Sequence, residues 1–409
     1  MLSVEEALER ILAEVDPLPT TEVPLSSSLG LVLASDIVAR EDIPPFANSA
    51  MDGFALRSKD SEPHGDQPPR LRVTGSIAAG YVAEHGVEEG TAMRIMTGAA
   101  VPPGADTVIQ VELTRQAGPE SDWVEILNVV PPGNNIRPAG EDMRQGQTVL
   151  TQGTTIGPWE IGILATLGRA MVPVVRRARV AILGTGDELV DVNQPLQAGK
   201  IRNSNSYLLE AAVLRSGASP HNLGIARDTL ASLQEKFSAA SAPGAYDLIL
   251  TSGGVSVGDF DLVKNVLTQQ GHMDFWRINM RPGKPVAFGR IGNTPLLGLP
   301  GNPVSSAVTF ELFARPLIRK LQGHTQLLKP QIEVTVIDGV SERSGRRHYV
   351  RAYVTWQGGH FVARTTGNQG SHIMTSLRNA NALLIVPENS PGIAQGATAQ
   401  AIMLDWPEA

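Results

Sequence analysis

The segment "YDLILTSGGVSVGDFDLVKNVL", residues 246–267, predicts an apolar strand, a serine- and glycine-rich loop and a helix that opens with Asp259 and Asp261. Strand, loop and helix in this order form the repeating unit of parallel α/β sheets. Glycine loops at helix starts usually present N–H groups to an anion, yet carboxylates repel phosphate. A divalent cation reconciles the two, because Mg²⁺ binds carboxylate oxygens on one side and phosphate oxygens on the other.

The same alternation of apolar strands and helices extends outward over residues 176–322. It predicts a doubly wound α/β domain, in which helices cover both faces of a parallel sheet. The expected strands are "RVAILGTG" (179–186), "HNLGIAR" (221–227), "FWRIN" (275–279), "PVAFGRI" (285–291) and "PLLGLPG" (295–301), and the expected helices include 205–217, 230–240 and a last one from about Val304.

The flanking sequence is organised differently. An acidic amphipathic helix opens the chain, short β-branched runs separated by "VPPG" turns follow, and further short strands end it. We therefore expect a multidomain α/β plus β protein. Its predicted parts are an N-terminal linking domain (1–45 and 141–175), a β-rich inserted domain (46–140), the α/β domain (176–326) and a small β-barrel-like domain (327–409).

Composition excludes several classes of protein. The 409 residues include 34 basic and 41 acidic side chains, a net charge of −7, which disfavours nonspecific nucleic-acid binding. The chain has no cysteine, so disulfides, thiolate nucleophiles and cysteine-held metals are excluded. No secretory signal and no apolar run of about 18 residues is present, so we expect a cytoplasmic protein without a membrane anchor.

Three unusual loops follow the predicted strands, at the sheet edge where open α/β sheets bind ligands. They are "GTGDEL" (184–189), "SGGVSVGDFD" (252–261) and "GLPGNPVSS" (298–306). "GTGDEL" has Leu189 where a dinucleotide-binding motif needs glycine, and the Gly-Lys of "RPGKP" (281–285) is followed by proline, so neither common phosphate motif fits.

These loops predict a shared site for a metal and an anion. Asp187, Glu188, Asp259 and Asp261 would supply oxygens to Mg²⁺, while glycine amides, Arg281 and Lys284 hold the anion. The alternative is purely structural, because an aspartate before a helix is commonly an N-cap that contributes about 1 kcal/mol.

Further segments carry candidate polar groups. Asn48 and Asp52 lie in a loop framed by proline and glycine, and "RNSNS" (202–206) places more asparagines at a helix start than capping requires. "NNIRPAGEDMRQG" (134–146) carries Arg137, Glu141 and Asp142, and its default interpretation is an exposed charged loop.

The eight histidines show no metal-ligand spacing. We expect His272, His348 and His372 at the surface.

Eight segments in order resemble the successive signatures of the MoeA family, the molybdopterin molybdenumtransferases, which is related to the E domain of gephyrin. The resemblance covers essentially the whole chain, although the C-terminal β region matches only in kind and position. The segments are "PFANSAMDGFAL", "RIMTGAAVPPGADTVI", "NIRPAGED", "GTGDEL", "GKIRNSN", "TSGGVSVGDFD", "RPGKPVAFG" and "GLPGNPVSS".

The resemblance implies a four-part homodimeric enzyme. Its implied reaction inserts molybdate into adenylylated molybdopterin with Mg²⁺, giving molybdenum cofactor and AMP. Each active site would lie between the α/β part of one subunit and the first two parts of the other. The implied partners are the molybdopterin adenylyltransferase of the pathway and acceptor molybdoenzymes or their chaperones.

The resemblance also implies site residues. It places functional positions at Asp52, Thr97, Glu188, Asp228 and Asp261, with Glu188, Asp228 and Asp261 as metal ligands. Residues that would shape the pocket or hold the cofactor are Ser252, Gly253, Gly254, Arg277, Arg281, Lys284, Pro300, Pro303, Arg137 and Asp142. The family commonly has lysine at the first position of "RPGKP". Arg281 keeps the positive charge there and carries it on a planar guanidinium with several N–H donors.

Two alternatives stay open at this point. One is a scaffold or cofactor-binding protein of the same fold without turnover, and the other is nucleotide transfer like that of molybdopterin adenylyltransferase. The N- and C-terminal parts argue against the second, and the full set of acidic residues argues against the first.

Overall fold

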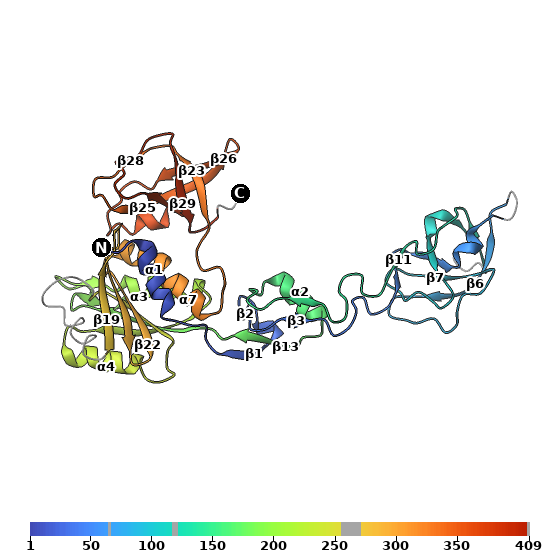
Figure 1. Cartoon of the computed structure of the whole chain (residues 1–409), viewed down its shortest axis with the longest axis horizontal. Coiled ribbons are helices and arrows are strands. Elements are labelled where there is room, and N and C mark those ends of the chain that lie inside the picture. The colour runs from blue at the N-terminus through green and yellow to red at the C-terminus, as the bar shows by residue number, and fades with distance from the viewer. Residues whose placement is uncertain (64–66, 117–121, 255–270, 407–409) are drawn as a thin grey trace. The chain divides into compact units, whose positions relative to one another are not determined.

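The computed structural model describes residues 1–63, 67–116, 122–254 and 271–406. The chain divides into two compact units (Figure 1). The main unit comprises residues 1–34, 153–157 and 171–409, and the inserted unit comprises residues 35–152 and 158–170. None of the described helices is both long enough and apolar enough to cross a membrane.

A six-stranded sheet forms the centre of the main unit, in the order β17-β14-β18-β22-β21-β19. Strands β17, β14, β18 and β22 pair in parallel, whereas β21 alone is reversed and pairs antiparallel with both β22 and β19, so the predicted parallel sheet is in fact mixed. The cause is Gly292–Asn293, a two-residue connection that makes a hairpin of β21 and β22. The strands are β14 (Arg179–Thr185), β17 (Ser219–Ala226), β18 (Leu248–Ser252), β19 (Gly271–Arg277), β21 (Pro285–Ile291) and β22 (Thr294–Leu299).

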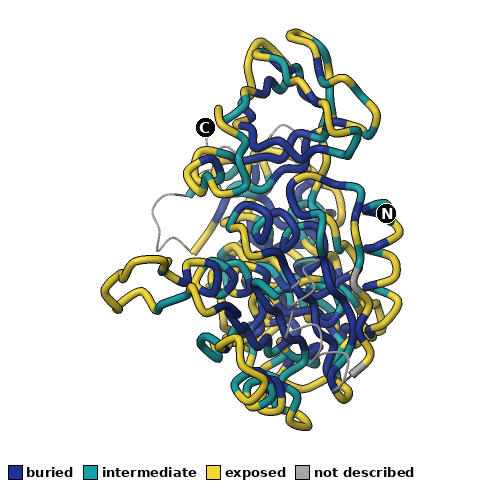
Figure 2. The backbone as a smooth tube through the Cα atoms, turned by 90° about the vertical axis from the view of Figure 1, so that its left-hand side faces the viewer, coloured by how far each residue is buried: buried dark blue, intermediate teal, exposed yellow. Residues whose placement is uncertain are grey.

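Alternate residues of the central strands enter two separate cores, as side chains on opposite faces of a sheet must. Ile182, Leu250 and Leu297 pack with α1, α3, α6 and α7, whereas Leu183 and Leu296 pack with α4. The two faces are thus covered by helices, and the buried strands between them are dark blue in Figure 2. The helices are α1 (Val4–Ala13), α3 (Ser204–Arg215), α4 (Leu230–Ala240), α6 (Pro303–Thr309) and α7 (Arg315–Leu321), the last two joined by a π-helical turn (Phe310–Ala314).

Strand direction brings several loops to one edge of this sheet, which we call the rim. The carboxyl ends of β14, β17, β18 and β22 lie there because these strands are parallel. Arg277 at the end of β19 pairs with Pro285 at the start of β21, so the turn of residues 278–284 lies at the same edge. The rim therefore carries two of the glycine loops (184–189 and 298–306), the described start of the third (252–254) and the basic "RPGKP" turn.

A closed β-barrel forms the C-terminal part of the main unit, as the sequence predicted. β25 pairs with β26 and β27, and the circle closes through β23 and β29. β20 (Met280–Arg281), from the basic turn, adds to this barrel by pairing in parallel with β25. The barrel strands are β23 (Gln331–Val336), β25 (Arg347–Gln357), β26 (His360–Thr365), β27 (Ala382–Val386) and β29 (Thr398–Met403).

The inserted unit is built on a sheet in the order β8-β5-β7-β6-β10-β9. The short helix α2 (Pro158–Thr166) is followed by Gly168 at φ 65°, a backbone angle common at helix ends and readily adopted by glycine. The strands are β5 (Gly53–Leu56), β6 (Arg70–Ile77), β7 (Thr91–Ile95), β8 (Thr107–Gln110), β9 (Thr114–Arg115) and β10 (Trp123–Ile126).

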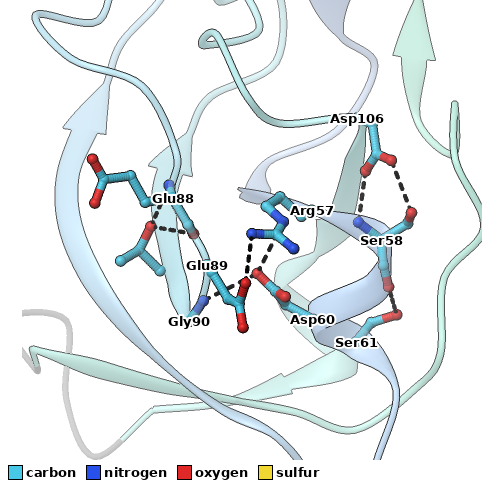
Figure 3. A network of polar contacts seen from close by, with 9 residues as sticks. Arg57, Ser58, Asp60, Ser61, Glu88, Glu89, Gly90 and Asp106 are labelled. Atoms are coloured by element: carbon cyan, nitrogen blue, oxygen red, sulfur yellow. Dashed lines mark hydrogen bonds and ion pairs between the residues drawn. The ribbon is translucent and has the colours of Figure 1, made fainter.

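A polar network ties loops of the inserted unit together (Figure 3). The Asp106 carboxylate accepts hydrogen bonds from the Ser58 N–H at 2.6 Å and from its hydroxyl at 2.9 Å. Asp60 accepts from the Gly90 N–H at 3.1 Å, and Arg57 forms an ion pair with Glu89 at 3.3 Å. These carboxylates are occupied by the fold itself, and we assign them a structural role.

Candidate functional site

Two acidic loops are joined to each other at the rim. The Asp187 N–H donates to the Asp228 carboxylate at 3.2 Å, and the Asp228 N–H donates to the Asp187 carboxylate at 3.2 Å. The Gly186 N–H donates to the Ala226 carbonyl at 3.3 Å. The structure therefore places Asp228 directly beside the "GTGDEL" loop, and these bonds use one oxygen of each carboxylate.

Glu188 completes this acidic group. A Cβ atom built on Gly186 would lie 2.2 Å from a Glu188 carboxylate oxygen, so the side chain folds back over the glycine. Asp187, Glu188 and Asp228 are all exposed. Their oxygen-only chemistry fits Mg²⁺, which binds one or two carboxylates together with water and substrate phosphates.

Only some of the predicted metal ligands lie within the described residues. Asp259 and Asp261 lie outside the described residues. Within the described ranges, no three histidine, aspartate or glutamate side chains converge closely enough to hold a metal ion by themselves.

Cationic side chains hold the backbone of the "GTGDEL" loop rather than its carboxylates. Lys200 donates from Nζ to the Asp187 carbonyl at 2.7 Å. Arg227 donates to the Leu189 carbonyl at 3.0 Å and reaches the Asp187 carbonyl at 3.4 Å. The loop is fixed in place while the acidic groups remain at the surface.

The glycine turn after β18 adopts backbone angles that favour glycine. Gly253 has φ 96° and Gly254 has φ 68°. A Cβ on Gly253 would approach the Thr185 carbonyl oxygen to 2.8 Å. The Gly253 N–H donates to the Leu299 carbonyl at 3.1 Å. The turn is thus pressed against the neighbouring strands, and only glycine fits at its centre.

Asn205 links two of the rim loops. Its Nδ2 donates to the Ser252 hydroxyl at 2.7 Å and to the Gly301 carbonyl at 2.8 Å, and its exposed fraction is 9%. Asn203 is the N-cap of α3 and accepts from the Ser206 N–H at 3.3 Å. The sequence indicated an excess of asparagines here, and the structure shows that the second one is a clamp between loops.

The loop after β22 starts α6 as predicted. Pro300 is buried and Pro303 lies in the first turn of the helix, behind the N-cap Asn302. The Val304 N–H donates to the Ser371 carbonyl at 3.1 Å. Because Ser371 belongs to the C-terminal part, the barrel reaches the rim at this point.

The basic turn has a partner that the sequence did not reveal. Arg277 is exposed and Lys284 is half-buried. The Arg281 side chain is 46% exposed, and its Nη1 lies 3.6 Å from Oε2 of Glu342, a carboxylate with no exposed side-chain area. Arg281 is therefore partly neutralised by a residue of the C-terminal part.

His348 is buried, with an exposed fraction of 3%, so the prediction of a surface position was wrong; His272 and His372 are exposed as predicted. His348 lies on β25 opposite Arg281, at the point where β20 pairs with β25. Burial, with the charge of Arg281, lowers its pKa to about 4 against the opposing effect of Glu342.

A second group of predicted residues lies on the inserted unit. Asp52 accepts hydrogen bonds at one oxygen from the Thr97 N–H at 2.7 Å and from the Thr97 hydroxyl at 2.8 Å. These bonds lower the pKa of Asp52 below its ordinary value, and the bond from the Thr97 backbone has the larger effect. The structure thus brings Asp52 and Thr97 together. Asp52 is an ionised carboxylate, Thr97 fixes its orientation, and both residues are exposed.

The loop that carries Asp52 is supported from both sides. Ser49 exchanges backbone hydrogen bonds with Gly98 at 2.8 Å and Ala99 at 3.0 Å. On the other side, β11 (Ile136–Arg137) pairs with β4 (Asn48–Ser49), which sets Arg137 opposite Asn48. Asp142 lies beside Ile43, to whose carbonyl its N–H donates at 3.0 Å. Arg137 and Asp142 are both exposed, as their charged segment predicted.

Comparisons with known proteins cover nearly the whole chain. Family models match residues 2–168 (MoeA N-terminal region, domain I and II), 181–320 (probable molybdopterin binding domain) and 334–404 (MoeA C-terminal region, domain IV).

Individual relatives agree with these matches. A molybdopterin molybdenumtransferase of Haemophilus influenzae is 36% identical over 97% of this chain and 97% of its own length. Gephyrin of Dictyostelium discoideum is 35% identical over 99% of this chain and 62% of its own length. The crystal structure of the molybdopterin biosynthesis moeA protein from Pyrococcus horikoshii OT3 is 30% identical with a TM-score of 0.83, over 98% of this chain and 100% of that one.

Proposed function

The chain belongs to the MoeA family, and from that premise we propose that it is a molybdopterin molybdenumtransferase. The reaction would insert molybdate into adenylylated molybdopterin, with Mg²⁺, and release molybdenum cofactor and AMP. The observation that carries the proposal is the rim itself, where acidic loops, a glycine turn and a basic turn meet at one sheet edge.

The residues of the rim suit this pair of substrates. Molybdate is a tetrahedral dianion and the other substrate carries a phosphoanhydride, so both need N–H donors and cations. Arg277, Arg281 and Lys284 offer positive charge, and the glycine turn would contribute the N–H of Gly254, since that of Gly253 is bound to the Leu299 carbonyl. The dithiolene of the pterin substrate supplies sulfur to molybdenum, which agrees with a chain that has no cysteine.

The acidic residues of the rim are assigned to Mg²⁺. When bound, the ion would neutralise charge that develops on the phosphate as the anhydride breaks. Glu188 and Asp228 would hold it through the oxygens that the fold leaves exposed, with Asp261 as the third expected ligand. Ser252, Pro300 and Pro303 would shape the pocket around it.

Asp52 is assigned to the pterin. An ionised carboxylate repels a dianion but accepts hydrogen bonds from N–H groups, which a pterin offers. Thr97 fixes one oxygen of Asp52 and leaves the other for such a donor. Arg137 and Asp142 would assist from the neighbouring loop.

We further propose a cytoplasmic homodimer that works with the pathway's molybdopterin adenylyltransferase and with acceptor molybdoenzymes or their chaperones. The family resemblance assigns Asp52 and Glu188 of one active site to different subunits. Complementation tests this: Asp52→Asn and Glu188→Gln proteins, each inactive alone, should regain activity when subunits are exchanged. No recovery after verified exchange would refute the shared site.

The proposed activity itself is tested by AMP release from adenylylated molybdopterin. We expect release that requires both molybdate and Mg²⁺. Release without molybdate would favour an adenylyltransferase-like enzyme, and tight binding without turnover would favour a scaffold.

A further inference from the structure

The C-terminal barrel contacts the basic turn of the rim through a strand pairing. β20 carries Arg281 and pairs in parallel with β25, so that Arg281 lies opposite His348. Glu342 approaches the same point from the segment that precedes β25, and its side chain has no exposed area. An arginine that the family resemblance assigns to anion binding is thus in contact with a buried carboxylate of another part of the chain.

The two oxygens of Glu342 have different surroundings. Oε1 accepts the N–H groups of Arg343 at 2.8 Å and Ser344 at 2.5 Å, which fixes the carboxylate in position. Oε2 lies 2.6 Å from His348 Nδ1 and 3.6 Å from Arg281 Nη1. The carboxylate is therefore oriented by the backbone, and its second oxygen is directed toward the arginine.

Arg281 places a positive charge beside the buried Glu342 carboxylate. Burial alone would raise the pKa of Glu342, but hydrogen bonds from Ser344, with His348 and Arg343, lower it to about 2. Burial lowers the pKa of His348 to about 4, against the opposing effect of Glu342. A buried ionised carboxylate is strongly unfavourable without a cation, and the Arg281 guanidinium, 3.6 Å from Oε2, supplies one.

We infer that Glu342 is a positioning residue. Its buried carboxylate holds the Arg281 guanidinium at the rim, and some of the guanidinium N–H groups remain free to bind an anion. Arginine suits this double task because its guanidinium has five N–H donors in a rigid plane, whereas a lysine offers a single point charge. Nearly half of the Arg281 side chain remains exposed after the contact with Glu342. The barrel therefore helps to set the geometry of substrate binding.

A double-mutant cycle tests this inference, which rests on the proposed function for its kinetic arm. Wild type, Arg281→Gln, Glu342→Gln and the double variant are compared in molybdate-dependent AMP release. We expect Glu342→Gln to raise KM for adenylylated molybdopterin about fivefold, the effect of a half-exposed ion pair, with kcat nearly unchanged. In the Arg281→Gln background the same substitution should have almost no further effect.

Equal losses in both backgrounds, or no loss in either, would overturn the inference. Asp338→Asn is the matched control, because Asp338 accepts hydrogen bonds from the Thr365 N–H at 2.9 Å and its hydroxyl at 2.6 Å within the same barrel. We expect this control to leave KM at the wild-type value.

A second measurement needs no turnover and separates this inference from the proposed function. Rotation of the Arg281 guanidinium is followed by ¹⁵N NMR of arginine side chains, with the signal assigned by its loss in Arg281→Lys. We expect slow rotation in wild type and fast rotation in Glu342→Gln. Equally fast rotation in both would refute the positioning role, whereas absent AMP release with slow wild-type rotation would refute only the proposed reaction.

Discussion

Replacement of Asn205 by alanine removes the clamp between two rim loops. The substitution deletes hydrogen bonds to the Ser252 hydroxyl and the Gly301 carbonyl, each worth about 1 kcal/mol net. The Asn205 Oδ1 is buried and has no hydrogen-bond partner among the described residues. Its removal relieves this unfavourable burial and therefore offsets part of the lost stability. We expect the free energy of unfolding to fall by about 1–2 kcal/mol.

The functional loss should exceed the loss of stability. Because the clamp holds the Ser252–Gly254 turn against the loop after β22, its removal lets both loops shift where the substrates would bind. Displacements of about 1 Å in a catalytic site can cost about 100-fold in rate. We expect kcat/KM of AMP release to fall at least tenfold under conditions where the variant is fully folded.

Asn381→Ala provides the matched control. Asn381 is 7% exposed and exchanges hydrogen bonds with the Val354 N–H at 2.7 Å and its carbonyl at 2.9 Å, inside the barrel. Thermal unfolding should show similar destabilisation in both variants, while only Asn205→Ala loses activity. Identical kinetics in the two folded variants would refute the positioning role of Asn205.

Gly253→Ala should destabilise the chain by about 1–3 kcal/mol through its positive φ and by more through the clash with β14, whereas Gly244→Ala, with φ 72° and nothing within 4 Å of its Cβ, should show only the backbone strain in thermal unfolding. Asp228→Asn should raise the Mg²⁺ concentration needed for half-maximal AMP release, and Asp191→Asn, an exposed carboxylate bound to the Tyr207 hydroxyl at 2.7 Å, should not. Asp52→Asn should abolish most AMP release. Because the pKa of Asp52 is lowered, its ionic contribution to stability exists above the ordinary value of 3.8 and is lost only as pH falls through the lower folded value, so the difference in thermal stability between wild type and variant should persist at pH 4.

The sequence predicted the architecture of the main unit because local patterns decide it. Alternating apolar strands and helices indicated the α/β sheet, and strand direction then placed the glycine loops at one edge. The antiparallel end of the sheet was missed, although Gly292–Asn293 is a recognisable hairpin signal once it is weighed against the α/β pattern.

Residues whose roles depend on distant contacts could not be predicted in this way. His348 follows two arginines in a polar stretch, which is typical of a surface position, and its burial comes from the pairing of β25 with β20, far away in the sequence. Glu342 likewise has no local pattern that connects it with Arg281. Asn205 was singled out, but its partners on β18 and after β22 become visible only in three dimensions.

The most direct test of the account measures molybdenum and AMP together. Purified protein is given adenylylated molybdopterin, molybdate and Mg²⁺, and the AMP released is compared with the molybdenum incorporated into the pterin. The account predicts equimolar amounts of the two and neither product when Mg²⁺ is withheld. AMP without incorporated molybdenum, or molybdenum incorporation without AMP, would contradict it.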